Sequence, residues 1–261
     1  MRGFGQAPVN NHSGCYTSLR GFEKQFATAV PALMYHKLGS RPRGVRLKGL
    51  YVSEGLFRRQ LAEWSAAGFG AGSVGEIGAK DGNPEKRVVI TFDDGFENVL
   101  RCGLEPMRSH GFTAIQFLVA DLVGKTNEWE QREGEVAERL MDVEQAREWL
   151  AAGHEIGAHT CTHPHLTQVP LAQAREEIFA SRQKLEDLFG LPVRHFCYPY
   201  GDWNPVVRDL VIEAGYETAV TTEAGVNLAG ADRFTLRRFT VRYPSRNWRN
   251  LFVALRRLVS H

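Results

Sequence analysis

Short apolar runs recur along this chain, and five of them begin directly after a helical pattern that ends in glycine. Glycine just past a helix end is the usual C-terminal cap, because it readily adopts the left-handed backbone conformation. Helix stops that each lead into a strand predict serial αβ units and a parallel sheet. The five junctions are Ala67-Gly68-Phe69, His110-Gly111-Phe112, Ala152-Gly153-His154, Phe189-Gly190-Leu191 and Ala214-Gly215-Tyr216.

The apolar patterns place seven strands and four helices along the chain. The predicted strands are residues 32–36, 88–92, 114–119, 155–159, 194–198, 218–221 and 235–241. The predicted helices are residues 53–67, 143–152, 171–189 and 205–214. Ser53 is expected to cap the first of these helices. The apolar face of that helix carries Phe57, Leu61 and Trp64.

Reactive side chains gather where the predicted strands end. Asp93 and Asp94 follow one strand, while His36 and His159 end two others. Active sites of (β/α) barrels lie at this edge of the sheet, but so do the ligand sites of open doubly wound sheets. Seven strands favour an α/β fold in the form of a distorted, incomplete (β/α) barrel with about seven parallel strands.

The chain is expected to form one main domain, residues 31–261, preceded by an extension, residues 1–30, that mixes Gly, Asn, Ser and charges. Residues 121–140 are predicted to be a long polar loop that contains Trp129, and loops of this length are often functional. Residues 248–259 have an apolar helical face, which suits packing on the domain or, alternatively, a membrane surface.

Composition and charge narrow the class of protein. The 261 residues are 43% hydrophobic and 24% charged, which is ordinary for a globular domain. A net charge of +2 gives no case for a nucleic-acid partner. No run approaches the roughly 20 apolar residues of a membrane span. The N-terminus lacks the pattern of a secretory signal, so a cytoplasmic location is expected, and the oligomeric state is left open.

The strongest chemical signal is a carboxylate pair followed by a histidine pair. Asp93 and Asp94 come directly after the apolar run 88–90, and His159 and His163 lie at the end of another strand. Buried adjacent carboxylates need a cation to balance them. Two histidines and one carboxylate form a metal site with open positions, and the second carboxylate can then act as a base. The pattern predicts metal-assisted hydrolysis.

Two other interpretations apply to residues of this pattern. The pair Asp93-Asp94 could be a helix N-cap with a spare surface acid, but the histidine pair argues against that reading. The thiolate of Cys161 lies between the two histidines and could bind the metal, although the histidines have the better spacing.

The motifs that carry this chemistry resemble those of the polysaccharide deacetylase family, which includes chitin-oligosaccharide and peptidoglycan N-deacetylases. Its first motif is matched by residues 91–95, Thr-Phe-Asp-Asp-Gly. Its second, His-(Ser/Thr)-x-x-His, is matched by residues 159–163, and its aromatic-rich Pro-(Tyr/Phe)-Gly turn by residues 196–201. Together with weaker local similarities, the resemblance covers residues 30–242.

The resemblance implies a role for each matched position. Asp94, His159 and His163 would bind a divalent metal, most commonly zinc and sometimes cobalt, manganese or nickel. Asp93 would be the general base, because a metal lowers the pKa of bound water and a neighbouring carboxylate can take its proton. The metal and a backbone N–H, that of Tyr198 in our prediction, would hold the oxyanion.

Aromatic residues are expected to bind the substrate. Tyr198, Pro199 and Tyr200 form the turn of the third motif. Trp129 is predicted to stack on a sugar ring from a mobile loop, with anchoring of that loop as the alternative.

The chain departs from the family pattern in two ways. An arginine often precedes the Pro-(Tyr/Phe)-Gly turn and orients the base, but here the position holds Cys197. The late Leu-x-His motif that donates the general acid is not evident. His36 is the candidate acid, and its alternative role is that of a hydrogen-bonded structural histidine.

An arginine from the last predicted strand is expected to replace the missing one, because ionised Asp93 beside Asp94 needs a cation besides the metal. Successive residues of a strand face opposite ways. If Leu236 and Thr240 face the interior of the barrel, Arg238 faces it too. If the alternate residues of the strand face the interior instead, Arg237 is the orienting arginine. We favour Arg238.

The sequence therefore predicts a metal-dependent hydrolase that removes N-acetyl groups from an N-acetylated carbohydrate. Two alternatives stay open: hydrolysis of an O-acetyl ester or a non-sugar amide, and a non-catalytic carbohydrate-binding relative.

Overall fold

A curled sheet of parallel strands organises the protein in the computed structural model, which describes residues 15–78 and 85–242. Its strand order is β1-β11-β2-β6-β7-β8-β9-β10, and β5 pairs with β6. The strands are β1 Cys15–Tyr16, β2 Ala32–Tyr35, β5 Gly70–Ala71, β6 Arg87–Phe92, β7 Ile115–Leu118, β8 Glu155–Ala158, β9 His195–Cys197, β10 Thr218–Val220 and β11 Phe239–Val241. A separate pair is β3 Lys37–Leu38 with β4 Tyr51–Val52.

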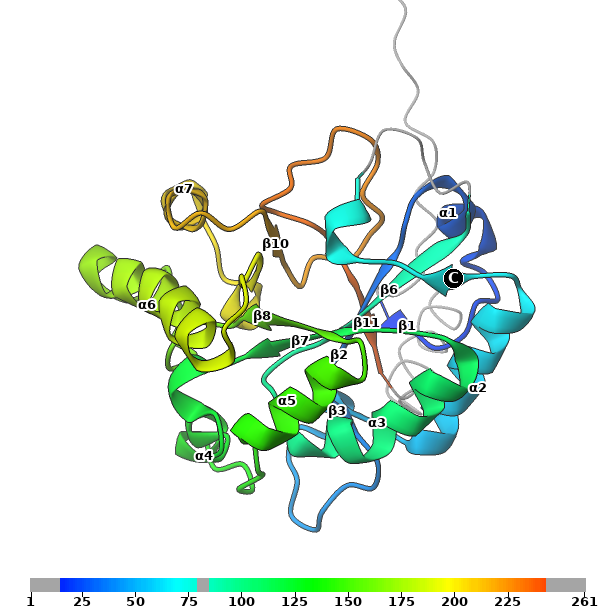
Figure 1. The fold of residues 1–261 in the computed structure, drawn as a ribbon, viewed down its shortest axis with the longest axis horizontal. Coiled ribbons are helices and arrows are strands. Elements are labelled where there is room, and N and C mark those ends of the chain that lie inside the picture. The colour runs from blue at the N-terminus through cyan, green and yellow to red at the C-terminus, as the bar shows by residue number, and fades with distance from the viewer. Residues whose placement is uncertain (1–14, 79–84, 243–261) are drawn as a thin grey trace, which may run out of the picture.

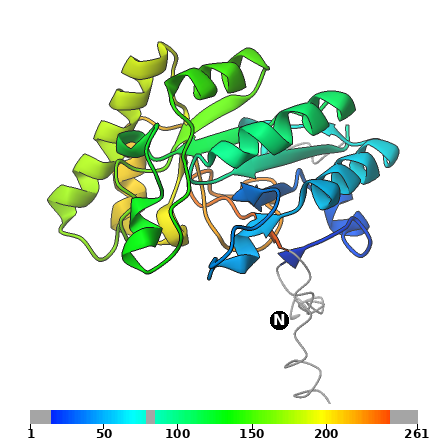
Figure 2. The same ribbon diagram turned by 90° about the horizontal axis from the view of Figure 1, so that it is seen from below.

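Helices cover the outside of the sheet (Figure 1). They are α1 Glu23–Thr28, α2 Glu54–Ala66, α3 Glu97–His110, α4 Glu128–Arg132, α5 Val143–Ala151, α6 Leu171–Phe189 and α7 Pro205–Glu213. Figure 2 shows α2, α3 and α5 side by side along one face. Side chains fix where several of them begin: Ser53 caps α2, Asp142 caps α5 and Asn204 caps α7.

The predicted fold class is confirmed. Each of the seven predicted strands overlaps a strand of the sheet, although the last observed strand is shorter, and the four predicted helices match α2, α5, α6 and α7 within two residues. The five glycines predicted to stop helices all have positive φ, between 68° and 86°. Every strand pair is parallel, as the serial αβ pattern predicted, while helix α3 and the short β1, β3, β4 and β5 were not predicted.

The last strand closes the curled sheet into a distorted barrel. Leu236 forms a parallel bridge with Val220 of β10. Three residues later the chain enters β11, which pairs with β2 on one side and β1 on the other. Arg238 lies between these two contacts and its side chain is fully buried. Closure of the barrel thus carries a charged side chain into the interior.

Two regions contain secondary structure that was not predicted element by element. The described part of the predicted extension forms β1 and α1, and its Tyr16 and Phe26 are packed in the main core. Residues 121–140 are not a plain polar loop, because they contain α4 and two antiparallel bridges. The predicted helical face in residues 248–259 lies outside the described residues. Within the described ranges, no helix has the length and apolar character needed to cross a membrane.

Candidate active site

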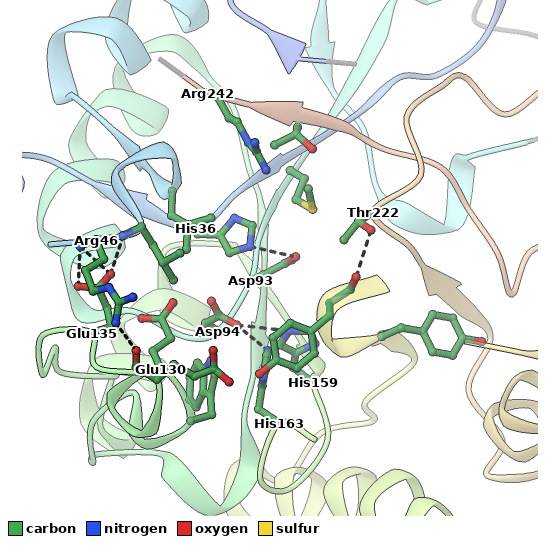
Figure 3. Close-up of a pocket in the computed structure, with 18 residues that line it drawn as sticks. His36, Arg46, Asp93, Asp94, Glu130, Glu135, His159, His163, Thr222 and Arg242 are labelled. Carbon is green, nitrogen blue, oxygen red and sulfur yellow. Dashed lines mark hydrogen bonds and ion pairs between the residues drawn. The ribbon is translucent and has the colours of Figure 1, made fainter. Parts of the chain in front are cut away.

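The carboxyl ends of the strands converge on one pocket of about 750 Å³ (Figure 3). Asp93 and Asp94 reach it from the end of β6, and His159 from the end of β8. His36 enters from the end of β2. Because all these strands are parallel, side chains far apart in the sequence meet at one edge of the barrel.

Asp94, His159 and His163 have the geometry of a metal site. The Oδ1 atom of Asp94 lies 3.3 Å from Nε2 of each histidine and is buried without a hydrogen-bond partner among the described residues. The Nδ1 atom of His159 is hydrogen-bonded to the carbonyl of Cys197 at 2.7 Å, which leaves the lone pair on Nε2. Burial lowers the pKa of His163 to about 4, so its ring is neutral at neutral pH. This donor set fits a divalent cation such as zinc.

Backbone strain is concentrated around this pocket. Five non-glycine residues in the described ranges have positive φ, and four of them belong to the site. Each such conformation costs about 1–3 kcal/mol and persists only where surrounding contacts impose it. The four are Asp94 at 76°, Thr160 at 65°, His163 at 66° and Tyr200 at 60°.

Glu177 of α6 fixes the segment that carries both histidines. Its buried carboxylate accepts hydrogen bonds from the backbone N–H groups of Cys161 at 2.8 Å and Thr162 at 2.9 Å. The hydroxyl of Thr160 accepts the N–H of His163 at 2.9 Å. The two ligands are therefore held by a network that begins on a helix outside the barrel.

Aromatic contacts, not a hydrogen bond, orient the ring of His163. Its Nδ1 atom is buried and unpaired within the described residues. The ring of Trp129 stacks on it, with centroids 4.5 Å apart and planes 22° apart. The ring of Tyr200 meets it edge-on at 4.6 Å. His163 is thus held by packing, whereas His159 is held by its bond to a carbonyl oxygen.

Asp93 faces a different partner, the guanidinium of Arg238. The Nη1 and Nη2 atoms of Arg238 donate to Oδ1 and Oδ2 of Asp93 at 2.7 and 2.8 Å. The guanidinium also donates to the carbonyl of Thr221 at 2.9 Å and the hydroxyl of Thr91 at 2.8 Å. Burial alone would raise the pKa of Asp93, but the charge and hydrogen bonds of Arg238 outweigh it and lower the pKa. Asp93 is therefore ionised at neutral pH.

The position of Cys197 explains how an arginine from another strand can reach the base. Its sulfur lies 3.3 Å from Nη2 of Arg238, so the small side chain leaves room for the guanidinium. Arg237 points away and pairs with Glu223 at 3.4 Å. Asp93, His159 and Cys197 also lie close enough to share a cation. That second set is the poorer metal site, because Arg238 already occupies Asp93 and burial raises the pKa of the thiol.

His36 lies beside the base, with Nε2 3.9 Å from Oδ2 of Asp93. It lines the pocket and is partly exposed to it. Burial lowers the pKa of His36, while the negative charges of Asp94 and Asp93 act in the opposite direction. A histidine in this place can exchange a proton with a group bound in the pocket.

The turn after β9 presents its residues unequally to the pocket. The phenol of Tyr198 is buried and donates to the carbonyl of Phe234 at 3.0 Å, while its backbone N–H donates to Val220 at 3.3 Å. Tyr198 lines the pocket, but its hydroxyl and its amide already have partners within the protein, so its contact with a substrate stays a prediction. Pro199 is buried and does not line the pocket. Tyr200 does line it, with 46% of its surface exposed.

Trp129 also lines the pocket, but it does not lie on a plain loop. It belongs to α4, is only 7% exposed and packs on His163. A buried ion pair next to it anchors this segment, because Lys37 lies 2.8 Å from both Glu130 and Glu138. These contacts support the anchoring alternative for Trp129.

Two supporting residues were missed at the sequence level. Glu177 lies on the buried face of α6 beside Ala174 and Ile178, and a carboxylate within an apolar repeat was the available signal. Lys37 directly follows His36 at the start of a buried strand pair, where an ammonium needs a partner.

The chain matches the family model described as Polysaccharide deacetylase over residues 80–219, more than half of its length. This range contains Asp93, Asp94, His159 and His163, but neither His36 nor Arg238.

Curated relatives include YxkH of Bacillus subtilis, 24% identical over 81% of this chain and 71% of that protein. The chitooligosaccharide deacetylase of Azorhizobium caulinodans is 29% identical over 50% of this chain and 56% of that enzyme. The peptidoglycan-N-acetylglucosamine deacetylase PgdA of Listeria monocytogenes is 25% identical over 53% of this chain and 26% of its own length. The chain therefore spans only part of these two enzymes.

Solved structures share the fold. The Streptococcus pyogenes deacetylase PplD aligns with a TM-score of 0.71 at 21% identity, covering 87% of this chain and 98% of that one. The polysaccharide deacetylase BC0361 of Bacillus cereus aligns with a TM-score of 0.70 at 23% identity, covering 83% and 66%.

Proposed function

The chain belongs to the polysaccharide deacetylase family, and we propose that it is a metal-dependent hydrolase that removes N-acetyl groups from an N-acetylated carbohydrate. One observation carries the proposal. The unpaired Oδ1 of Asp94 lies 3.3 Å from two histidine nitrogens, directly beside a carboxylate that Arg238 keeps ionised. The chitooligosaccharide and peptidoglycan deacetylases among its relatives support a carbohydrate substrate.

The residues of the site divide the chemistry of amide hydrolysis between them. Asp94, His159 and His163 would hold the metal, which when bound polarises the acetyl carbonyl and makes water a better nucleophile. Asp93 is the general base that takes a proton from the attacking water. The water oxygen adds to the acetyl carbon, and the carbon–nitrogen bond then breaks as the leaving nitrogen gains a proton, so the products are acetate and a free amine.

His36 is proposed to deliver a proton to the leaving nitrogen, since an amine departs poorly without one. Because burial lowers the pKa of His36, it would receive that proton from Asp93 after Asp93 has taken it from the attacking water. It lies on the same pocket wall as Asp93 and 3.9 Å from it. An activated aryl ester has a leaving group that needs no proton. His36→Gln should therefore lower hydrolysis of an N-acetyl sugar by ~10²-fold or more and hydrolysis of an aryl acetate far less. Equal losses on both substrates would contradict this role.

The direct test of the proposal is acetate release by protein loaded with zinc, cobalt, manganese or nickel. Chitin oligosaccharides supply the N-acetyl donor, acetylated xylan supplies an O-acetyl donor, and a simple N-acetylated amine supplies a non-sugar amide. Acetate from the first donor, released at least ~10²-fold more slowly by Asp93→Asn, is the expected result. Turnover of xylan or the simple amide alone would favour the ester or non-sugar alternative. No acetate from any donor would overturn the enzymatic assignment and favour a non-catalytic binding protein.

A further inference from the structure

A loop at the mouth of the pocket is strongly basic. Residues 39–52 contain no aspartate or glutamate, but four exposed cations: Arg41, Arg43, Arg46 and Lys48. Within the described ranges none of the four pairs with a carboxylate. Several arginines on the helices differ, since they do pair with acids: Arg58 with Glu54, Arg175 with Glu213 and Arg208 with Asp232. Residues 39–48 are called the basic loop below.

The basic loop is fixed in place from beneath. The buried carboxylate of Glu135 accepts the backbone N–H groups of Arg46 at 2.9 Å and Leu47 at 2.6 Å. The guanidinium of Arg46 donates to the carbonyl of Glu133 at 2.6 Å. A loop that is already ordered loses less conformational entropy when a ligand binds. The end of the loop that carries Arg46 is therefore held at the mouth of the pocket.

The basic loop is continuous with the pocket. Arg46 and Leu47 line the same cavity as Asp93 and Asp94 (Figure 3). Arg242, the last described residue, lines it too and lies against residue 49, where an added Cβ would be 3.7 Å from its Cδ. The loop projects from the rim of the molecule beyond β3 (Figure 1). A polymer with one sugar in the pocket can therefore continue over this surface.

From this arrangement we propose that the substrate is an anionic N-acetylated polysaccharide, and that the basic loop binds acidic groups on the sugars next to the one being deacetylated. The inference rests on the proposed deacetylase function and specifies its substrate further. Arginine suits this task, because its planar guanidinium matches carboxylate and phosphate oxygens in pairs. Clustered charge of one sign beside a cleft also raises the local concentration of an oppositely charged ligand.

A membrane surface fits the loop less well. Among residues 39–48 the one large apolar side chain that is exposed is Leu47, at 46%, and it lines the pocket. Peripheral membrane binding needs substantial buried apolar area in addition to cations. The loop offers cations at the entrance of a sugar-sized pocket, which favours the glycan.

The test compares affinities for two N-acetylated oligosaccharides of equal length, one from hyaluronan, with a carboxylate in each repeat, and one from chitin, which is neutral. Calorimetry would be run on metal-loaded Asp93→Asn protein, in which turnover is suppressed, with the native basic loop and with the added changes Arg41→Gln/Arg43→Gln/Lys48→Gln. The variant should lower the ratio of hyaluronan to chitin affinity about tenfold, the sum of three partly screened charges. The effect should be clear at about 20 mM salt and nearly absent at about 300 mM.

The matched control removes the same charges elsewhere, in Lys24→Gln/Arg59→Gln/Arg108→Gln on α1, α2 and α3, and none of these residues lines the pocket. It should leave the ratio within twofold of the native value. An equal fall in both triple variants would overturn the proposal, as would native protein that binds both oligosaccharides equally at low salt. Binding to anionic phospholipid vesicles that depends on the loop, with no effect on either glycan, would replace it by the membrane reading.

This experiment is independent of catalysis. Affinity is measured without turnover, so a protein that prefers hyaluronan through its loop but releases no acetate keeps the basic loop as a binding surface and rejects the enzymatic function. A protein that releases acetate but shows no loop-dependent preference keeps the enzymatic function and rejects the basic loop as a binding surface.

Discussion

The site has two sides built from adjacent residues, and they neutralise their carboxylates in opposite ways. On the base side, both oxygens of Asp93 accept hydrogen bonds from buried Arg238. On the metal side, Oδ1 of Asp94 faces the neutral ring of His163 and has no hydrogen-bond partner in the described part of the chain. Arg238 is a fixed cation, whereas the only charge within the described residues that faces Oδ1 of Asp94 is a proton on His159, whose pKa is raised by Asp94 and Cys197 against the effect of burial and which a metal would displace. A buried carboxylate without a partner is costly, so the metal side is prepared for an external cation.

The comparison shows why one aspartate can be a base while its neighbour is a ligand. Arg238 occupies both oxygens of Asp93, and a metal beside it would meet the guanidinium charge. The strained backbone at Asp94, with φ of 76°, turns its carboxylate away toward the two histidines. Each aspartate is thus committed to one task by what surrounds it.

The largest effect is expected from removing the charge on the metal side. Asp94→Asn should weaken metal binding by more than ~100-fold, beyond the usual loss of an outer partner, and abolish acetate release with it. The measurement is a chelator competition on purified protein, with elemental analysis as the check. A native metal content in this variant would contradict the assignment of Asp94 as a ligand, because the metal would then need another ligand set.

A large loss of activity without loss of metal is expected on the base side. Asp93→Asn keeps the shape of the side chain and removes its basicity, so kcat should fall by ~10²–10⁴-fold. Metal content should equal that of the native protein. Thermal unfolding must be followed in parallel, because the substitution leaves the buried charge of Arg238 unbalanced. Near-normal turnover would remove Asp93 as the base.

Removing Arg238 should leave Asp93 as a buried acid without a cationic partner. Arg238→Met leaves Asp93 in a desolvated site, so its pKa should rise and the acidic limb of the rate profile should move to higher pH. Breaking a buried pair typically costs about 3–5 kcal/mol of stability. Rate profiles with the metal content checked, and unfolding curves, are the measurements.

The pH dependence of that stability loss has a definite sign. In the native protein the lowered pKa of Asp93 stabilises the fold above the unfolded value near 3.8, and this contribution is lost as pH falls through the folded pKa. In Arg238→Met the pKa of Asp93 lies above the unfolded value, so ionised Asp93 destabilises the fold at neutral pH. The difference in Tm between the two proteins should therefore be larger at pH 7 than at pH 4. A constant difference, with an unmoved rate profile, would show that Arg238 does not tune the base.

The smallest effect is expected from the aromatic support of His163. Trp129→Ala removes the stacked ring, so metal affinity should fall about tenfold, as for other groups that orient a ligand. Trp129→Phe keeps a stacking partner and should recover most of the affinity. An unchanged metal affinity with a raised KM would instead support direct stacking on the sugar.

Much of the framework could be predicted from short stretches of sequence. Glycines that end helices, such as Gly111 and Gly190, can be predicted from the residues of one helix end. The strand before Asp93 can be predicted from its own apolar run. The metal set could also be predicted, because His159 and His163 lie close in the chain and parallel strands bring their carboxyl ends to one edge. These features depend on contacts over a few residues, or on a rule common to all parallel barrels.

The last predicted strand offers two arginines that could orient the base. Alternation narrowed the orienting arginine to Arg237 or Arg238, and the inward position of Leu236 favoured the second. The structure places Arg238 against Asp93 and Arg237 against Glu223. The choice was decided by barrel closure, because the strand touches β10 at one end and β2 at the other.

The sequence by itself therefore determined the elements, their order and the residues that meet at the carboxyl edge. Only the tertiary structure decided which partners they find there. The amide of Tyr198 is used within the sheet, Trp129 is buried against His163, and Glu177 reaches the histidine segment from α6. These pairings join residues from elements that are not neighbours in sequence, so their distances exist only once the barrel has closed and the side chains have packed.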